Sequence, residues 1–307
     1  MIDSKDISVV VQGAIDKENT PLCLKSIRKY LPKAKIILST WENSNVDYLD
    51  YDKLILNKDP GHTYVQNPDI TDKNSLILNN INRQIVSTVN GLNAVETRYT
   101  LKLRTDFEIR GTRFLKYFNK FKDSTNDMKI FEKRIVSFCP CYPDRTPFHP
   151  CDFLFFGLTS DLNILFDIPL QTESEAYWFI DNKPVNIEQY NSVYLNSVYR
   201  FCPEMHLWKE CLTKRFPEEM SKFRDLSDNS NENILNSELS YVNNFIGINA
   251  YQWQIFALKD SLNRINENKF KGHHIMNYKD WKKLYFKHVA KSNFKNFLNY
   301  FISNIQN

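Results

Sequence analysis

Glycine is scarce in this chain, at only 7 of 307 residues. Such a composition excludes a flexible or repetitive polymer. No Gly-x-Gly-x-x-Gly pattern follows the first strand-like segment, which argues against a dinucleotide-binding dehydrogenase. The 40 basic and 36 acidic residues nearly balance, and this argues against nucleic acid as a partner, because proteins that bind it usually carry a concentrated basic stripe.

Long apolar segments are also lacking. No stretch approaches the ~20 apolar residues that a transmembrane helix needs, and the polar start of the chain does not resemble a signal peptide. We therefore expect a cytoplasmic protein whose six cysteines are reduced thiols. Lysines alternate with aromatic residues over residues 269–295. This pattern is compatible with peripheral contact with the inner face of the cytoplasmic membrane, or with the solvated face of an amphipathic helix.

Short apolar segments predict an α/β fold. Residues 7–11 are β-branched and end at Gln12-Gly13, which is typical of a buried parallel strand that opens into a loop. A helix over residues 20–30 and a second strand at residues 35–39 complete a β-α-β unit. We further expect strands at 53–56, 99–103, 134–138 and 152–158, helices at 76–95, 114–121 and 160–166, and a loop at 59–74.

The expected architecture is a mostly parallel sheet flanked by helices, followed by a mainly helical C-terminal region. We predict a nucleotide-binding α/β region over residues 1–170 and a mainly helical region over residues 171–307. No clear linker separates the two, so they are expected to form one continuous domain.

The sequence Arg104-Thr105-Asp106 follows a predicted strand. An acid at that point lies at the carboxyl edge of the sheet, where open α/β folds bind ligands. Asp106 could hold a divalent cation or a ribose, and Arg104 could partly replace the charge of the cation. The alternative is a solvated acid in a surface loop.

Two further polar groups lie near the predicted strand ends. Trp41 could stack on a nucleobase and Glu42 could accept hydrogen bonds from a ribose, or the pair is a half-buried tryptophan beside a solvated acid. Asn82 and Arg83, in an otherwise apolar predicted helix, could bind a pyrophosphate or orient Asp106. The alternative for these two is an ordinary solvated helix face.

Five segments, in this order, resemble the WavE family of lipopolysaccharide-synthesis proteins, which are similar to GT-A glycosyltransferases. They are residues 9–13, 23–28, 37–42, 82–85 and 101–106. The resemblance covers roughly residues 5–210. It implies a GT-A-like fold and the transfer of a sugar, most simply a hexose, from a nucleotide-sugar donor to a glycan or lipid-linked acceptor, such as a growing lipopolysaccharide, capsule or O-antigen.

With this resemblance, the donor nucleotide is expected over Gln12, Gly13, Trp41 and Glu42, and its diphosphate near Asn82, Arg83, Arg104 and Asp106. The family pattern also includes a polar position before an aromatic strand and a Pro-Glu pair before a helix. Asp152 and Glu204 match these positions. Whether the reaction inverts or retains the anomeric configuration stays open; for an inverting reaction we expect Asp152 to be the general base, with Glu204 second. Their structural alternatives are a turn acid for Asp152 and a helix-dipole acid for Glu204.

A divalent cation, Mn²⁺ or Mg²⁺, is a further expectation. Its ligands would be Asp106 and His274, because a C-terminal histidine can complete the metal site of GT-A enzymes. Only one acid occupies the Asp-x-Asp region, so metal dependence stays open at this point. A structural zinc site with the four ligands Cys139, Cys141, His149 and Cys151 is disfavoured by the one-residue spacing between the first two cysteines.

Two other functions remain open from the sequence. A sugar-phosphate nucleotidyltransferase usually has a glycine-rich basic loop after its first strand, whereas residues 12–16 contain one glycine and no basic residue. A non-catalytic polysaccharide-binding protein would use aromatic side chains to stack on sugars. For that protein, an Asp106→Ala change would leave ligand binding intact.

Overall fold

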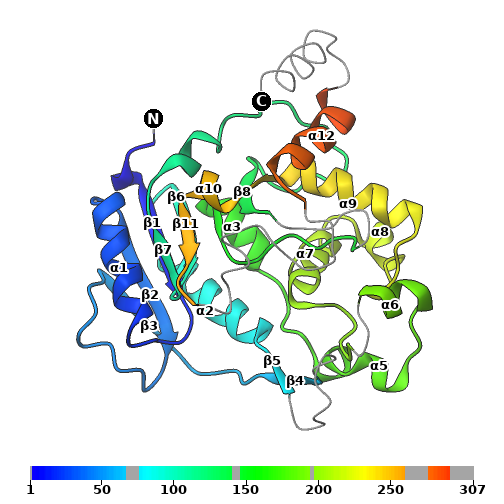
Figure 1. The fold of residues 1–307 in the computed structure, drawn as a ribbon, viewed down its shortest axis with the longest axis horizontal. Coiled ribbons are helices and arrows are strands. Elements are labelled where there is room, and N and C mark those ends of the chain that lie inside the picture. The colour runs from blue at the N-terminus through cyan, green and yellow to red at the C-terminus, as the bar shows by residue number, and fades with distance from the viewer. Residues whose placement is uncertain (1, 67–75, 140–145, 194–196, 260–275, 291–307) are drawn as a thin grey trace.

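The computed structural model describes residues 2–66, 76–139, 146–193, 197–259 and 276–290. A seven-stranded sheet forms its centre, in the order β10-β8-β9-β6-β1-β2-β3 (Figure 1). Only β9 runs antiparallel to its neighbours, β6 and β8. The strands are β1 (Ile7–Gln12), β2 (Lys35–Trp41), β3 (Lys53–Asn57), β6 (Tyr99–Arg104), β8 (Ile135–Phe138), β9 (Phe155–Leu158) and β10 (Phe245–Ile248). The predicted α/β fold with a mostly parallel sheet is confirmed, and it is consistent with a GT-A-like fold.

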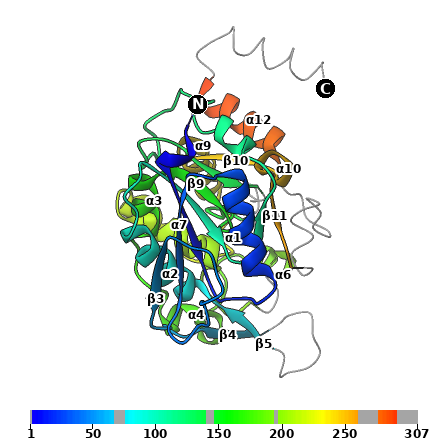
Figure 2. The same ribbon diagram turned by 90° about the vertical axis from the view of Figure 1, so that its left-hand side faces the viewer.

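Helices cover both faces of this sheet. In Figure 2, α1 (Asn19–Tyr30) lies on one face and α2 (Ile81–Asn93) and α3 (Thr159–Phe166) lie on the other. This arrangement follows from right-handed crossovers, because β2 and β6 flank β1 on opposite sides. All six residues of β1 are buried, so this strand forms the middle of the core.

The remaining elements are shorter or lie in the C-terminal half. The helices are η1 (Ser4–Asp6), η2 (Arg113–Lys116), α4 (Glu173–Ala176), α5 (Trp178–Asp181), α6 (Ile187–Val193), α7 (Pro203–Thr213), α8 (Pro217–Ser221), α9 (Asn231–Asn244), α10 (Ala250–Trp253) and α12 (Tyr278–His288). Two small antiparallel sheets pair β4 (Thr63–Gln66) with β5 (Leu76–Asn79), and β7 (Phe107–Ile109) with β11 (Ile255–Ala257).

Three sequence-based expectations about secondary structure were wrong. The expected loop at 59–74 contains β4, and the expected helix at 76–95 is the strand β5 followed by α2. The expected helix at 114–121 is only the short turn η2. β4 and β5 stabilise each other by backbone pairing, and local apolar periodicity does not reveal such a partner.

The C-terminal half, expected to be mainly helical, also contributes two strands. β10 extends the central sheet beside β8, and β11 pairs with β7, which begins directly after Asp106. The Leu258 N–H donates to the Asp106 carbonyl oxygen at 2.9 Å. This contact brings the chain after β11 to the carboxyl edge of β6.

The described part of the lysine-rich C-terminal segment is the amphipathic helix α12. Trp281 and Tyr285 are buried against the protein, while Lys287 forms an ion pair with Glu238 at 2.6 Å. The described part of the segment therefore forms an amphipathic helix, the second of the two interpretations of the lysine pattern, and its contact with a membrane stays a prediction. None of the described helices combines the length and the apolar character that crossing a membrane would require.

Candidate functional site

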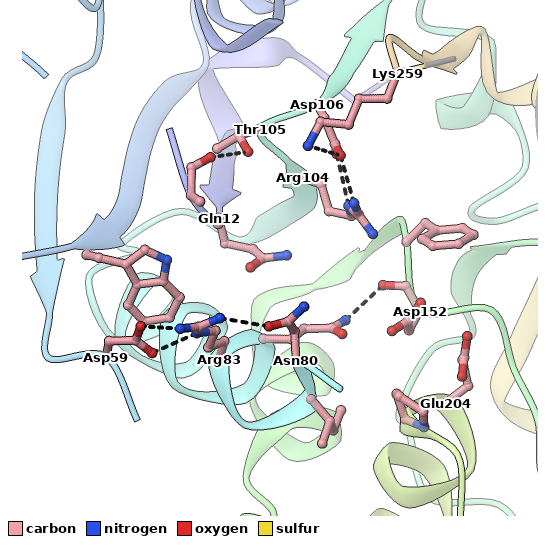
Figure 3. A pocket seen from close by; sticks show the side chains of 17 residues that line it. Gln12, Asp59, Asn80, Arg83, Arg104, Thr105, Asp106, Asp152, Glu204 and Lys259 are labelled. Carbon is pink, nitrogen blue, oxygen red and sulfur yellow. Dashed lines mark hydrogen bonds and ion pairs between the residues drawn. The ribbon is translucent and has the colours of Figure 1, made fainter. Parts of the chain in front are cut away.

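A cavity of about 520 Å³ opens where β1, β2 and β6 end. Parallel strands present their carboxyl ends at one edge, and there open α/β sheets bind ligands. Figure 3 shows side chains from both halves of the chain pointing into this cavity. Eight of the residues predicted from the sequence line it: Gln12, Gly13, Trp41, Arg83, Arg104, Asp106, Asp152 and Glu204.

Gln12 and Gly13 form the turn after β1. Gly13 has φ +124°, a backbone conformation that side chains with a Cβ rarely adopt, and its N–H donates to the Ser39 carbonyl at 3.1 Å. Gln12 accepts a hydrogen bond from the Ser87 hydroxyl at 2.8 Å. Its amide group is thereby held at the cavity, as Figure 3 shows.

Arg104 and Asp106 form a bidentate ion pair on one wall of the cavity. The Nε and Nη2 atoms of Arg104 donate to the two carboxylate oxygens of Asp106 at 2.9 and 2.7 Å. Lys259 adds a second cation, with Nζ 3.5 Å from Asp106 Oδ2. Burial alone would raise the pKa of Asp106, but Arg104 and then Lys259 outweigh it and hold this pKa below its ordinary value. Asp106 is therefore an anion that orients two cations.

Of the two predicted metal ligands, only Asp106 lies among the described residues. Both oxygens of Asp106 already accept hydrogen bonds from Arg104, and a divalent cation would have to displace this guanidinium. The present arrangement around Asp106 therefore does not fit a metal. His274 lies outside the described residues.

Arg83 lies on a different wall of the cavity and is also paired. Its Nε and Nη2 atoms donate to the Asp59 carboxylate at 2.8 and 2.5 Å, and its Nη1 donates to the Asn80 side chain at 3.0 Å. The hydrogen bonds from Arg83 lower the pKa of Asp59. Both Asp59 and Asn80 line the cavity, although the sequence reading named neither.

Two predicted donor residues do not line the cavity. Glu42 is exposed and lies outside the lining, one residue beyond Trp41. Asn82 instead bonds to the backbone of Gln171, accepting from its N–H at 2.8 Å and donating to its carbonyl at 3.0 Å. Asn82 thus ties α2 to the segment after α3.

Asp152 lies in the loop before β9 and is held by its backbone. Its carbonyl oxygen accepts from Lys102 Nζ at 2.6 Å and from Gln84 Nε2 at 3.1 Å. Lys102 lies on β6 and is fully buried, with the rings of Phe155 and Phe166 each 5.8 Å from its Nζ. Burial lowers the pKa of Lys102 from 10.5 to about 8. Two donors from separate elements therefore position Asp152 at the cavity.

Glu204 lies across from Asp152 at the start of α7 (Figure 3). Burial is the main cause that raises its pKa, and the negative charge of Asp152 adds to the effect. His149 opposes this shift, with Nε2 3.8 Å from the Glu204 carboxylate. The cavity thus contains two interacting carboxyl groups, and their environments differ.

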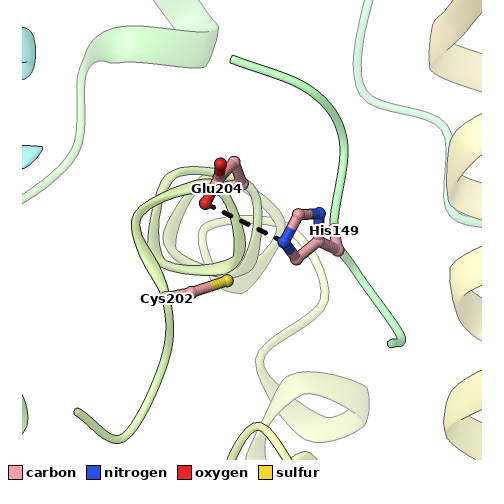
Figure 4. A group of neighbouring side chains, drawn as sticks. All are labelled: His149, Cys202 and Glu204. Carbon is pink, nitrogen blue, oxygen red and sulfur yellow. Dashed lines mark ion pairs between the residues drawn. The ribbon is translucent and has the colours of Figure 1, made fainter. Parts of the chain in front are cut away.

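His149, Cys202 and Glu204 form a compact group beside these carboxyls (Figure 4). One nitrogen, one sulfur and one oxygen atom lie within 4.8 Å of one another, a ligand set that could hold an ion such as Zn²⁺. Burial, and then the charge of Glu204, raise the pKa of the Cys202 thiol well above its ordinary value. The thiol is therefore protonated unless a cation displaces its proton.

Tertiary contacts place two of the residues missed from the sequence: Lys259 lines the cavity, and Lys102 supports it through the Asp152 carbonyl. Lys259 follows a strand hidden in a region that looked helical, and Lys102 alternates with leucines in a strand that is buried on both faces. Asp59 follows β3 closely, so its position after a predicted strand was a signal that the sequence reading did not use.

Comparison with known families supports the resemblance seen in the motifs. The family model described as WavE lipopolysaccharide synthesis matches residues 7–307. This match extends well beyond the roughly 200 residues in which the motifs lie and includes the segment that carries Lys259. Comparison with curated proteins gives no match.

Proposed function

Because the chain belongs to the WavE family of lipopolysaccharide-synthesis proteins, we propose that it is a nucleotide-sugar-dependent glycosyltransferase that extends a lipopolysaccharide or related surface polysaccharide. One observation carries the proposal: the cavity at the carboxyl edge of the sheet, which we call the donor cavity, presents cationic side chains on some walls and the carboxyl groups of Asp152 and Glu204 on another. The cations suit the diphosphate of a donor, and the carboxyl groups suit proton transfer from an acceptor hydroxyl.

The donor diphosphate is assigned to the wall formed by Arg104 and Lys259. These two cations share one acid, Asp106, so the trio retains one positive charge. Arg83 is balanced by Asp59 and would contribute hydrogen bonds more than net charge. Trp41, at the end of β2, offers its ring for stacking on the nucleobase.

The reaction is an inverting substitution at the anomeric carbon of the donor sugar. The acceptor oxygen forms a bond to this carbon, the bond from the carbon to the diphosphate oxygen breaks, and Asp152 accepts the hydroxyl proton. Arg104 and Lys259 stabilise the charge that develops on the departing diphosphate. Glu204 is the second candidate for the base, and its raised pKa makes it a stronger proton acceptor once it is ionised.

Charge compensation by side chains has a direct consequence for metal dependence. Arg104 and Lys259 occupy the position beside Asp106 that a divalent cation would take. Donor binding is therefore expected to persist in EDTA. A strict requirement for Mn²⁺ or Mg²⁺ would instead indicate that Arg104 is displaced when donor binds.

The first experiment is a thermal-shift panel of UDP, GDP, CMP and TDP, each with Mn²⁺ and with EDTA. One nucleotide is expected to raise the melting temperature, since a ligand stabilises the state that binds it. The sugar derivatives of that nucleotide are then assayed for turnover with a membrane fraction as acceptor. The proposal is overturned if no nucleotide raises the melting temperature.

The second experiment separates binding from chemistry. Asp152→Asn should keep the nucleotide-dependent thermal shift and lose ~10²–10⁴-fold in turnover, the usual contribution of a general base. Glu218→Gln, at an exposed position of α8, is the matched control and should behave as the wild type. If Asp152→Asn and Glu204→Gln both turn over at the wild-type rate, neither carboxyl group is the base.

A further inference from the structure

A second cavity, of about 450 Å³, lies at the opposite edge of the sheet. Arg134 directly precedes β8 and Asn243 lies two residues before β10, and both strands run in the same direction as β6. The donor cavity is at the carboxyl edge of β6, so this amino-edge cavity is separate from it. Four of its lining residues are cationic and one is acidic: Lys122, Lys129, Lys133 and Arg134 against Glu132.

Arg134 is a buried cation that neutral groups hold in place. Its three nitrogens donate to the backbone carbonyls of Val242, Phe121 and Asp123 at 2.5, 3.0 and 2.6 Å. Only 6% of the residue is exposed, and among the described residues no carboxylate lies within ion-pair distance of it. Burial lowers its pKa to about 10. Neutral groups fix the direction of this charge, and the Asp123 carboxylate offsets it only from beyond ion-pair distance, which is costly in a buried site.

The lysines of the amino-edge cavity have no ion-pair partner among the described residues either. Lys129 Nζ donates to the Ser124 hydroxyl at 3.0 Å, so that a neutral group orients it. A buried acid close in sequence to β9, Asp161, accepts the backbone N–H groups of Glu132 and Lys133 at 2.9 and 3.0 Å. Burial raises the pKa of Asp161, which weakens it further as a counter-charge.

From this arrangement we infer that the amino-edge cavity binds a phosphate group. Guanidinium and ammonium groups supply only hydrogen-bond donors, and phosphate oxygens supply only acceptors and negative charge. The phosphate could belong to a soluble molecule or to an anionic lipid headgroup. The inference does not depend on the proposed transferase activity, because no residue of the donor cavity takes part.

Isothermal titration with inorganic pyrophosphate at low ionic strength tests the inference. An Arg104→Gln background weakens binding at the donor cavity, so that the remaining pyrophosphate binding reports mainly on the amino-edge cavity. In that background, adding Lys129→Gln and Lys133→Gln should weaken pyrophosphate binding at least tenfold. Adding Lys25→Gln, an exposed lysine on α1, is the matched control and should leave the affinity unchanged. Lys129 is partly exposed and Lys133 and Lys25 are exposed, so the variants should fold.

Vesicles distinguish the two phosphate sources. Phosphatidylcholine vesicles with and without phosphatidic acid are sedimented with each variant. A lipid headgroup is identified by vesicle binding that meets three conditions. It requires phosphatidic acid, pyrophosphate competes with it, and the Lys129→Gln/Lys133→Gln variant loses it. Pyrophosphate binding without vesicle binding identifies a soluble phosphate. The inference is overturned if the double variant and Lys25→Gln bind both ligands equally.

Discussion

The buried amine of Lys102 gives a pH dependence of stability that can be calculated in advance. Its pKa is about 8 in the folded protein, against the ordinary 10.5 expected in the unfolded chain. Between these values the unfolded chain binds the proton and the folded protein does not. Stability therefore rises with pH over this window, by up to ~1.4 kcal/mol per pH unit and ~3 kcal/mol in all.

The perturbation is Lys102→Met, which keeps the length of the side chain and removes the titrating group. Urea denaturation at intervals from pH 7 to pH 10.5 gives the free energy of unfolding of each protein. The free energy of unfolding of the wild type minus that of the variant should be constant below pH 8. It should then rise by ~3 kcal/mol between pH 8 and pH 10.5. Buried thiols and phenols whose pKa values are raised act in the opposite direction, but they titrate in both proteins and cancel in the difference.

Two controls make this test decisive. Lys25→Met removes an exposed lysine, and its difference from wild type should show no such rise. Lys102→Met should also reduce turnover, because the donor at 2.6 Å from the Asp152 carbonyl is lost and Gln84 alone remains. Parallel stability curves for wild type and Lys102→Met would show that Lys102 is solvated or neutralised, and would refute the reasoning.

Three further predictions concern the core and the donor cavity. Gly91→Ala should lower the free energy of unfolding, measured by urea denaturation, by ~1–2 kcal/mol. The added Cβ would lie 2.5 Å from Val10 Cγ1, and this overpacking outweighs the higher helix propensity of alanine. An unchanged urea midpoint would contradict this prediction. Arg104→Gln should weaken the binding of the selected nucleoside diphosphate by ~10–100-fold in calorimetry, the value of one or two charged hydrogen bonds, and an unchanged Kd would remove Arg104 from the diphosphate site. Trp41→Ala should weaken nucleotide binding by ~1–3 kcal/mol while inorganic pyrophosphate binds as before; equal losses for both ligands would argue against base stacking.

Much of the fold was predictable because strand burial leaves a strong local signal. The buried runs of β1, β2 and β6 end at Gln12, Trp41 and Arg104, respectively, and parallel strands place such ends at one edge. Strand type and direction therefore predicted which residues would meet. The same reading failed at β4 and β5, because an isolated antiparallel pair depends on a partner that local periodicity does not specify.

The electrostatic state of the site was decided by tertiary structure. The residue types in Arg104-Thr105-Asp106 suggested a metal-binding acid. In the folded protein the Arg104 guanidinium instead donates to both carboxylate oxygens of Asp106, two residues further along the chain. Lys259 reaches the same acid only because β11 pairs with β7.

By itself, the sequence determined most strands of the central sheet, its carboxyl edge and eight of the residues that line the cavity there, because these follow from the burial and direction of single strands. Only the tertiary structure decided which charges neutralise one another and which remain available to a ligand. Lys102 beneath Asp152 and Arg134 among backbone carbonyls illustrate the reason. The charge state and orientation of a buried cation depend on partners that are 50 or 108 residues away in sequence, and their distance in space is set by packing.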